Sequence, residues 1–114
     1  MLTGRNALVT GAGKGIGKAI AMELAANGAF VIVNYNGSKA AAEQTVAEIK
    51  EAGGDAVAYQ CNVADYKACA GMTADLIKSY AHIDILVNNA GITRDGLLMK
   101  MSEEDFDAVI DTNL

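Results

Sequence analysis

The sequence lacks several features by which whole classes of protein are recognised. Its 114 residues include no proline, no tryptophan and only two cysteines. Cys61 and Cys69 are too few and too close together for a disulfide framework, so we interpret them as free thiols in a reducing cytosol. No apolar run approaches the roughly 18 residues of a membrane span. Basic residues number nine against fourteen acidic ones, which argues against the basic surface of a nucleic-acid binder.

What the chain does contain is enough apolar sequence for one folded domain over residues 1–114. The hydrophobic fraction of 52% excludes a disordered chain. The first five residues lead directly into a strand pattern, which leaves no room for a signal peptide. No cluster of metal ligands is seen, and His82, alone at a turn, is expected to be a solvated surface residue. We therefore expect a cytoplasmic globular domain with neither a membrane nor a nucleic-acid partner and with no metal site.

Short apolar runs alternate with longer segments of helical periodicity. Glycine pairs or Asn-Gly end the helical segments, and Ser38, Asp65 and Ser102 are placed to cap them. Because the apolar runs have no polar face, they indicate buried parallel strands with helices on both faces of one sheet, joined by right-handed crossovers. The expected order is βαβαβαβα, with strands at residues 7–10, 30–33, 56–59 and 85–87.

The last expected helix begins near Ser102 and includes Phe106, Val109 and Ile110. Its pattern is interrupted at Leu114 with no cap, glycine or polar tail. A natural domain rarely stops in mid-pattern, so we expect the chain to be a truncated part of a larger domain.

A glycine-rich loop follows the first strand and precedes the first helix. It has the form Thr10-Gly11-x-x-x-Gly15-x-Gly17 and includes Gly13, Lys14 and Ile16. Such a loop allows a tight turn, close approach of a pyrophosphate, and contact between helix and strand. The spacing fits neither the G-x-G-x-x-G fingerprint nor a P-loop. The strand-loop-helix context favours a dinucleotide site, and the alternative is an ordinary glycine-rich turn.

Together with Asn88-Asn89-Ala90-Gly91 after the fourth strand, this loop resembles the short-chain dehydrogenase/reductase family. The stretch from Gly91 to Asp105 most resembles its 3-oxoacyl-acyl-carrier-protein reductases of fatty-acid synthesis. The resemblance implies a Rossmann-like doubly wound α/β sheet of strand order 3-2-1-4, of which this chain is the N-terminal half. It also implies a homo-oligomeric enzyme acting on an acyl-carrier-protein-linked 3-oxoacyl substrate.

The residues after the second strand favour NADP(H) as the cofactor. An acid that would bind the ribose diol of NAD is missing there, since the first acid is Glu43. Amide, hydroxyl and lysine groups would instead accept a 2′-phosphate. We therefore expect NADPH to be preferred over NADH, although the lysines could be ordinary surface charges. The residues concerned are Tyr35, Asn36, Ser38 and Lys39, together with Lys14 of the glycine loop, which adds a second cation.

The resemblance places further cofactor contacts at the ends of the third and fourth strands. Asn62 and Val63 stand where the family usually has Asp-Val at the edge of the adenine. Asn62 can both donate and accept, so a contact with adenine survives this departure. Asn89, Ala90 and Gly91 resemble the segment that lines the cofactor groove.

Most of the family's catalytic residues are absent from the chain. Its serine and Tyr-x-x-x-Lys pair have no counterpart here, and only Asn113, which would anchor a water in the proton relay, can be carried over. An ordinary helical surface amide is the alternative for Asn113. Tyr35 and Lys39 match the spacing of the pair, but Gly37 interrupts the helix that would align them. We therefore expect the 114-residue chain alone to be inactive.

Two further expectations follow from the predicted topology. Without later strands, the fourth strand would be an apolar edge, through which two chains could pair at Ile85–Val87. A non-catalytic nucleotide-binding or self-associating fragment is thus the alternative to an enzyme part. Ala81, where relatives often have glycine, would carry some strain as a left-handed helix cap.

Overall fold

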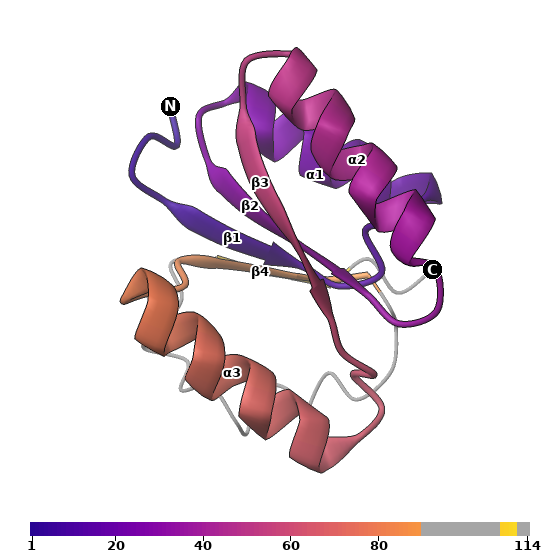
Figure 1. The fold of residues 1–114 in the computed structure, drawn as a ribbon. Coiled ribbons are helices and arrows are strands. Elements are labelled where there is room, and N and C mark those ends of the chain that lie inside the picture. Colours follow the sequence, from indigo (N-terminus) through magenta and orange to yellow (C-terminus); the bar gives the residue numbers. More distant parts are fainter. Residues whose placement is uncertain (90–107, 112–114) are drawn as a thin grey trace.

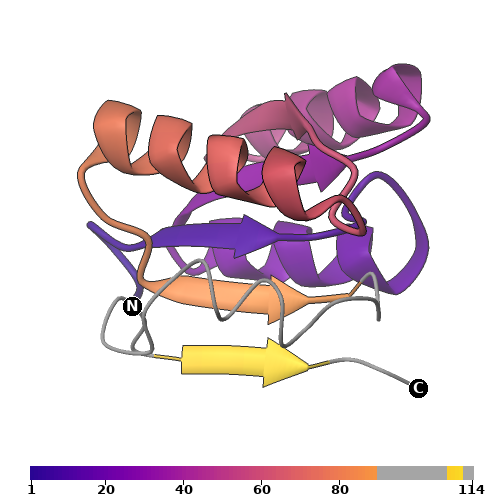
Figure 2. The same cartoon turned by 90° about the horizontal axis from the view of Figure 1, so that it is seen from below.

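The computed structural model describes residues 1–89 and 108–111, and its centre is a parallel β-sheet. The strands lie in the order β3-β2-β1-β4-β5 (Figures 1 and 2). The predicted order 3-2-1-4 of the first four strands is therefore confirmed. The bounds are Asn6–Val9 for β1, Phe30–Tyr35 for β2, Asp55–Gln60 for β3, Ile85–Asn88 for β4 and Ala108–Asp111 for β5.

Helices cover both faces of the sheet, as predicted. Helices α1 (Gly15–Ala26) and α2 (Lys39–Glu51) lie on one face, and α3 (Tyr66–Tyr80) lies on the other (Figure 1). The predicted caps are confirmed for two of them. The Ser38 side chain accepts a hydrogen bond from the backbone of α2, and that of Asp65 accepts two from the backbone of α3.

The two faces have separate cores because successive strand residues point to opposite sides of the sheet. In β1, Ala7 and Val9 pack toward α1 and α2, whereas Leu8 packs toward α3. The first core is rich in alanine, which lets α1 and α2 approach the strands closely. The second contains the larger side chains Met72 and Leu76 of α3. This layering leaves the strand ends, and the loops attached to them, as the places for a site.

The prediction of a helix through Val109 and Ile110 is wrong. Residues 108–111 form β5, which pairs in parallel with β4 from Ile85↔Ala108 to Asn88↔Asp111. A short apolar segment with two β-branched residues fits a strand as well as a helix, and pairing with a neighbouring strand decides between them. The proposed capping residue, Ser102, lies outside the described residues.

The expectation that β4 is an open edge is therefore also wrong. Its outer side is hydrogen-bonded to β5, so Ile85–Val87 offers no free backbone for pairing with a second chain. The expected positive φ at the end of α3 is found, since Ala81 has φ 71°, but its ψ of −40° lies outside the left-handed helical region. Within residues 1–89 and 108–111, no helix is long and apolar enough to cross a membrane. No group of three or more potential metal ligands occurs in that same part.

Candidate functional site

The glycine loop lies at the carboxyl end of the sheet, between β1 and α1. Gly11 and Gly15 have φ of 61° and 64°, values that residues with a Cβ adopt only with strain. Lys14 is the N-cap of α1 in an extended conformation, and its side chain makes no capping hydrogen bond. Since α2 and α3 are both capped by side chains, α1 differs in presenting its first amides, and the positive end of its dipole, without a side-chain cap.

The first half of this loop is held by hydrogen bonds to other elements. The backbone N–H of Gly11 donates to Asn34 Oδ1 at 3.2 Å, and that of Ala12 donates to the Asn34 carbonyl at 3.0 Å. Thr45 Oγ1, on α2, lies 3.1 Å from the Gly13 carbonyl, to which it can donate. The loop is thus shaped by the protein itself. Because the first two amides are already used, a phosphate would be bound by the amides that follow.

Gly17 makes room for another contact of the loop. Asn89 Nδ2 donates to the Gly11 carbonyl at 3.2 Å, across the start of α1. A Cβ on Gly17 would lie closer than 3.0 Å to both of these groups. The third glycine of the motif is therefore required by the packing of the loop against Asn89, whether or not a ligand is bound.

Thr10 joins the ends of β1 and β4 directly beside this loop. Its Oγ1 accepts from the backbone N–H of Asn89 at 2.9 Å and lies 3.3 Å from Asn88 Oδ1, to which it can donate. Asn88 is fully buried, and its Nδ2 has no hydrogen-bond partner among residues 1–89 and 108–111. An unpaired buried amide is costly, so the site retains a donor that a water or ligand could satisfy.

A cavity of about 380 Å³ lies between the glycine loop and the segment that follows β2. Among the described residues, no carboxylate lines the cavity, and Lys14 is the one charged residue in its lining. The Oγ of Ser38 accepts from Ala41 N at 3.2 Å, which leaves its hydroxyl proton available to a ligand. The lining residues are Gly11, Gly13, Lys14, Tyr35, Asn36, Gly37, Ser38 and Ala41.

The structure thus brings together six of the predicted cofactor residues and leaves others apart. Lys39 begins α2 and is exposed, but it does not line the cavity. Ile16 is 52% exposed at the start of α1, and Val63 is buried in the core beneath α3. Asn62 follows β3, and its Oδ1 accepts from Ala64 N at 3.0 Å, so its contact with adenine stays a prediction. The predicted residues Ala90, Gly91 and Asn113 lie outside the described residues.

Sequence reasoning missed the side chains that support this site. Asn34 and Thr45 are buried polar residues, and Gln60 Nε2 donates to the Asn36 carbonyl at 3.2 Å. The position of Asn34 at the end of an apolar strand was a usable signal, because a polar residue that is buried there needs partners. The roles of Thr45 and Gln60 depend on contacts between elements and leave no local pattern.

Two groups at the end of β3 keep their protons at neutral pH. Burial, and secondarily the neighbouring thiol of Cys69, raises the pKa of Cys61 to about 11. Burial and a 2.6 Å hydrogen bond to Asp75 raise the pKa of Tyr59 to about 12. Neither group is therefore suited to proton transfer near pH 7.

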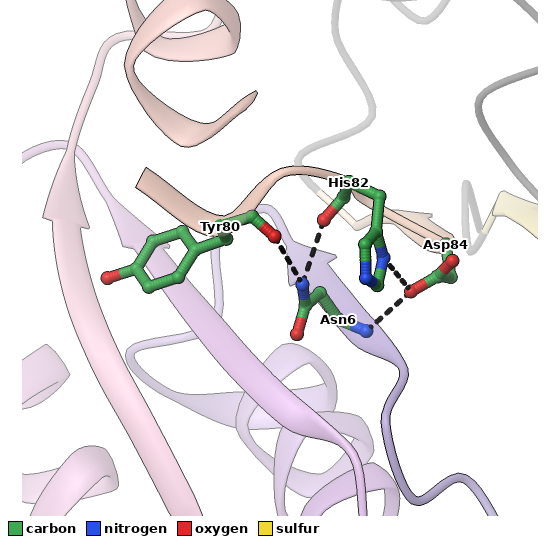
Figure 3. Close-up of polar contacts among 4 residues, drawn as sticks. All are labelled: Asn6, Tyr80, His82 and Asp84. Carbon is green, nitrogen blue, oxygen red and sulfur yellow. Dashed lines mark hydrogen bonds and ion pairs between the residues drawn. The ribbon is translucent and has the colours of Figure 1, made fainter. Parts of the chain in front are cut away.

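A second polar cluster lies at the amino end of the sheet (Figure 3). Asp84 Oδ2 accepts from Asn6 N at 2.8 Å and lies 2.7 Å from His82 Nδ1. Asn6 Nδ2 donates to the carbonyls of His82, at 2.9 Å, and Tyr80, at 3.3 Å. His82 is exposed, as expected, but it is not alone, because its ring contacts the Asp84 carboxylate. Because Asn6 begins β1 and Thr10 follows its end, this cluster is separated from the glycine loop by the length of the strand.

Comparison with known proteins agrees with this geometry. The family model for short chain dehydrogenases matches residues 5–114. The 3-oxoacyl-(acyl-carrier-protein) reductase of Staphylococcus aureus (strain Mu50 / ATCC 700699) is 54% identical over 110 residues, which are 96% of this chain and 45% of the relative. The chain thus spans less than half the length of this relative.

Two solved structures are also similar. A metagenomic short-chain oxidoreductase in complex with NADP has a TM-score of 0.76 and 36% identity, over 80% of this chain and 41% of that chain. An NAD⁺-bound xylitol dehydrogenase has a TM-score of 0.73 and 36% identity, over 79% of this chain and 34% of that chain. Since either dinucleotide occurs in a similar fold, the choice between them has to be argued from the residues of the cavity.

Proposed function

This chain belongs to the short-chain dehydrogenase family, and on that premise we propose that it forms the NADPH-binding portion of a 3-oxoacyl-acyl-carrier-protein reductase. The observation that carries the proposal is the cavity between the glycine loop and the segment after β2. It combines a backbone cradle, the N-terminus of α1 without a side-chain cap, and a cation, and none of its described lining residues is a carboxylate. These groups fit a dinucleotide that carries an additional phosphate.

The charges of the cavity support NADPH over NADH. A 2′-phosphate of the adenosine ribose would meet Lys14 and the Ser38 hydroxyl, both of which favour an anion. Tyr35 occupies the end of β2, where an acid would be needed to bind a free ribose diol. Lys39, at the start of α2, adds positive charge close to this edge of the site.

When bound, the dinucleotide would supply the hydride that reduces a ketone. The residues of this chain would bind and orient it. The amides that begin α1 would hold the pyrophosphate, Asn62 the adenine, and Asn89 with Ala90 and Gly91 the wall of the groove. Asn113 would anchor a water for proton transfer. Apart from Tyr35 and Lys39, which match only the spacing, the sequence contains no Ser and Tyr-x-x-x-Lys set, so we expect the 114 residues alone to bind the cofactor without reducing a ketone.

The remaining partners are proposed from the relatives. The acyl-carrier-protein-linked substrate rests on the 54% identity to the staphylococcal reductase and concerns the whole enzyme. A cytoplasmic location and assembly into a homo-oligomer belong to the same proposal.

The test is a titration of the 114-residue chain with NADPH and NADH, followed by nicotinamide fluorescence. We expect saturable binding that favours NADPH. Replacing Lys14 by Glu should weaken NADPH binding by about tenfold or more, because it loses an attraction and adds a repulsion at the phosphate, and should change NADH binding little. Lys78→Glu, on an exposed position of α3 at the far end of the sheet, is the matched charge control. Failure of both dinucleotides to bind, or an unchanged preference in Lys14→Glu, would contradict the proposal.

A further inference from the structure

The side chain of Asn34 contacts two separate parts of the proposed nucleotide site, the glycine loop and the end of β3. It lies within β2, one residue before the end of the strand, and its exposed fraction is 2%. Its Oδ1 accepts from Gly11 N of the glycine loop at 3.2 Å. Its Nδ2 lies 3.1 Å from the Cys61 carbonyl and 3.4 Å from the Tyr59 carbonyl, both at the end of β3. One side chain therefore joins the loop after β1 to the end of β3.

The contacts match the chemistry of a primary amide in particular. The Oδ1 of Asn34 accepts from the backbone N–H of Gly11, and the two hydrogens on its Nδ2 face the carbonyls of Tyr59 and Cys61. The three contacts therefore use the oxygen and both hydrogens of the amide. An aspartate of the same shape could still accept from Gly11 N, but it would set a negative charge against two carbonyl oxygens. A serine would be too short to span the three partners. The three contacts at position 34 thus require a side-chain amide, and another buried polar residue would not make them all.

A second amide, Gln60, holds the opposite wall of the cavity. Its Nε2 lies 3.2 Å from the Asn36 carbonyl and 3.3 Å from Asn36 Oδ1. Asn36 lines the cavity on the side that would receive the 2′-phosphate. The two amides therefore act on different walls: Gln60 on the segment after β2, and Asn34 on the glycine loop that leads into α1.

We propose that Asn34 is a positioning residue that sets the glycine loop, and with it the pyrophosphate-binding amides of α1, at a fixed separation from the adenosine end of the site. This inference rests on the proposed function, because it assumes a ligand that reaches from one end to the other. A ligand that occupies only the adenosine end should depend much less on Asn34. The complete dinucleotide should depend on it strongly, since small misplacements of a binding group weaken the whole interaction.

The test compares NADP⁺ with 2′-AMP, which lacks the pyrophosphate and the second nucleoside. In Asn34→Ser, calorimetry should show the affinity for NADP⁺ reduced by about tenfold or more and that for 2′-AMP by less than about threefold. Gln60→Ala is the matched control, because it loosens the adenosine wall and should weaken both ligands by similar factors. Asn34→Ala, which removes the same three contacts without adding a polar group, provides the same comparison where the serine variant does not fold.

Amide hydrogen exchange without ligand gives a second readout. Gly11 N–H is held by the side chain of Asn34, whereas Ala12 N–H is held by its backbone carbonyl. In Asn34→Ser, protection of Gly11 should therefore fall about tenfold while that of Ala12 changes little, and a merely destabilised protein would lose both alike.

Equal losses for NADP⁺ and 2′-AMP in the Asn34 variants, or equal losses of protection at Gly11 and Ala12, would overturn the inference and leave the proposed function standing. A wild-type chain that binds neither ligand would overturn the proposed function and this inference together.

Discussion

The two ends of the parallel sheet carry polar clusters of opposite character. At the amino end, Asp84 and the side-chain amide of Asn6 are engaged by other groups of the chain, which ties β1 to the turn between α3 and β4. At the carboxyl end, the loop from Gly11 to Gly13 is likewise held by the protein. There, however, α1 begins without a side-chain cap, and within the part of the chain that the structure describes Asn88 keeps a buried donor unpaired.

Whether the polar groups satisfy one another thus distinguishes the structural cluster at the amino end from the candidate binding site at the carboxyl end. Polar groups that serve the fold alone satisfy one another, whereas a site for a ligand keeps donors available at a cost in stability. The comparison therefore predicts that substitutions at the carboxyl end change nucleotide binding. Substitutions at the amino end should change only the free energy of unfolding.

The largest effect is expected for Gly17→Ala. The added Cβ would overlap the Gly11 carbonyl and Asn89 Nδ2, so the loop or α1 must move. We expect NADPH binding to be lost and the free energy of unfolding, measured in urea, to fall by about 1–3 kcal/mol. Gly71→Ala is the control, since Gly71 is also helical but has open space around its Cβ position. That variant should be about 0.5–1 kcal/mol more stable than wild type. Equal behaviour of the two variants would contradict the account of the loop.

A smaller effect is expected at the other end of the sheet, for Asp84→Ala. This change removes the acceptor of Asn6 N and the partner of His82. Because a half-buried N–H loses its hydrogen bond, the free energy of unfolding should fall by about 1–3 kcal/mol. The affinity of the folded protein for NADPH should stay within about twofold of wild type, because the length of β1 separates Asp84 and its partner Asn6 from the glycine loop. A selective loss of affinity would mean that the two ends are coupled.

His82→Ala should have a weaker effect than Asp84→Ala. The His82 side chain is 52% exposed, and solvent screens its interaction with Asp84. We expect a loss of less than about 1 kcal/mol in urea unfolding, since Asp84 would still accept from Asn6 N. A loss as large as that of Asp84→Ala would show that the histidine, rather than the backbone contact, is the main partner of the carboxylate.

The last effect is expected only in the alkaline range and should be absent at neutral pH; it concerns Cys61, which follows β3. The pKa of the Cys61 thiol rises from an ordinary value of 9.0 to about 11 in the folded protein. The unfolded chain therefore releases this proton first, and stability should decline as the pH rises from about 9 to about 11. The decline should be shallower in Cys61→Ala when unfolding is followed across this range. If stability declined with pH at the same slope in the two proteins, the raised pKa of the Cys61 thiol would be contradicted.

Sequence reasoning predicted the first four strands, the helices between them and the glycine loop, because each has a local signature. Apolar runs, capping residues such as Ser38 and Asp65, and glycine spacing are properties of neighbouring residues. The strand at 108–111 was predicted as helix because a four-residue apolar segment does not distinguish the two periods. The segment is a strand because it pairs with β4, and this pairing joins residues more than 20 positions apart.

The supporting contacts of the site were beyond local patterns for the same reason. Asn34 meets Gly11 and Cys61 only because β1, β2 and β3 lie side by side in parallel. Asp84 likewise meets Asn6 across 78 positions of sequence. Residue types could indicate which groups bind a phosphate, but the partners that hold those groups follow from the topology.

The most direct test of this account is a titration of the isotopically labelled chain with NADPH, followed through its backbone amide resonances. We expect the largest shifts at Gly13–Gly17 and at Tyr35–Ser38, with residues 80–84 unchanged at the opposite end of the strands. Shifts concentrated at residues 80–84, or no shift in the glycine loop at saturating NADPH, would contradict the division between a binding end and a structural end.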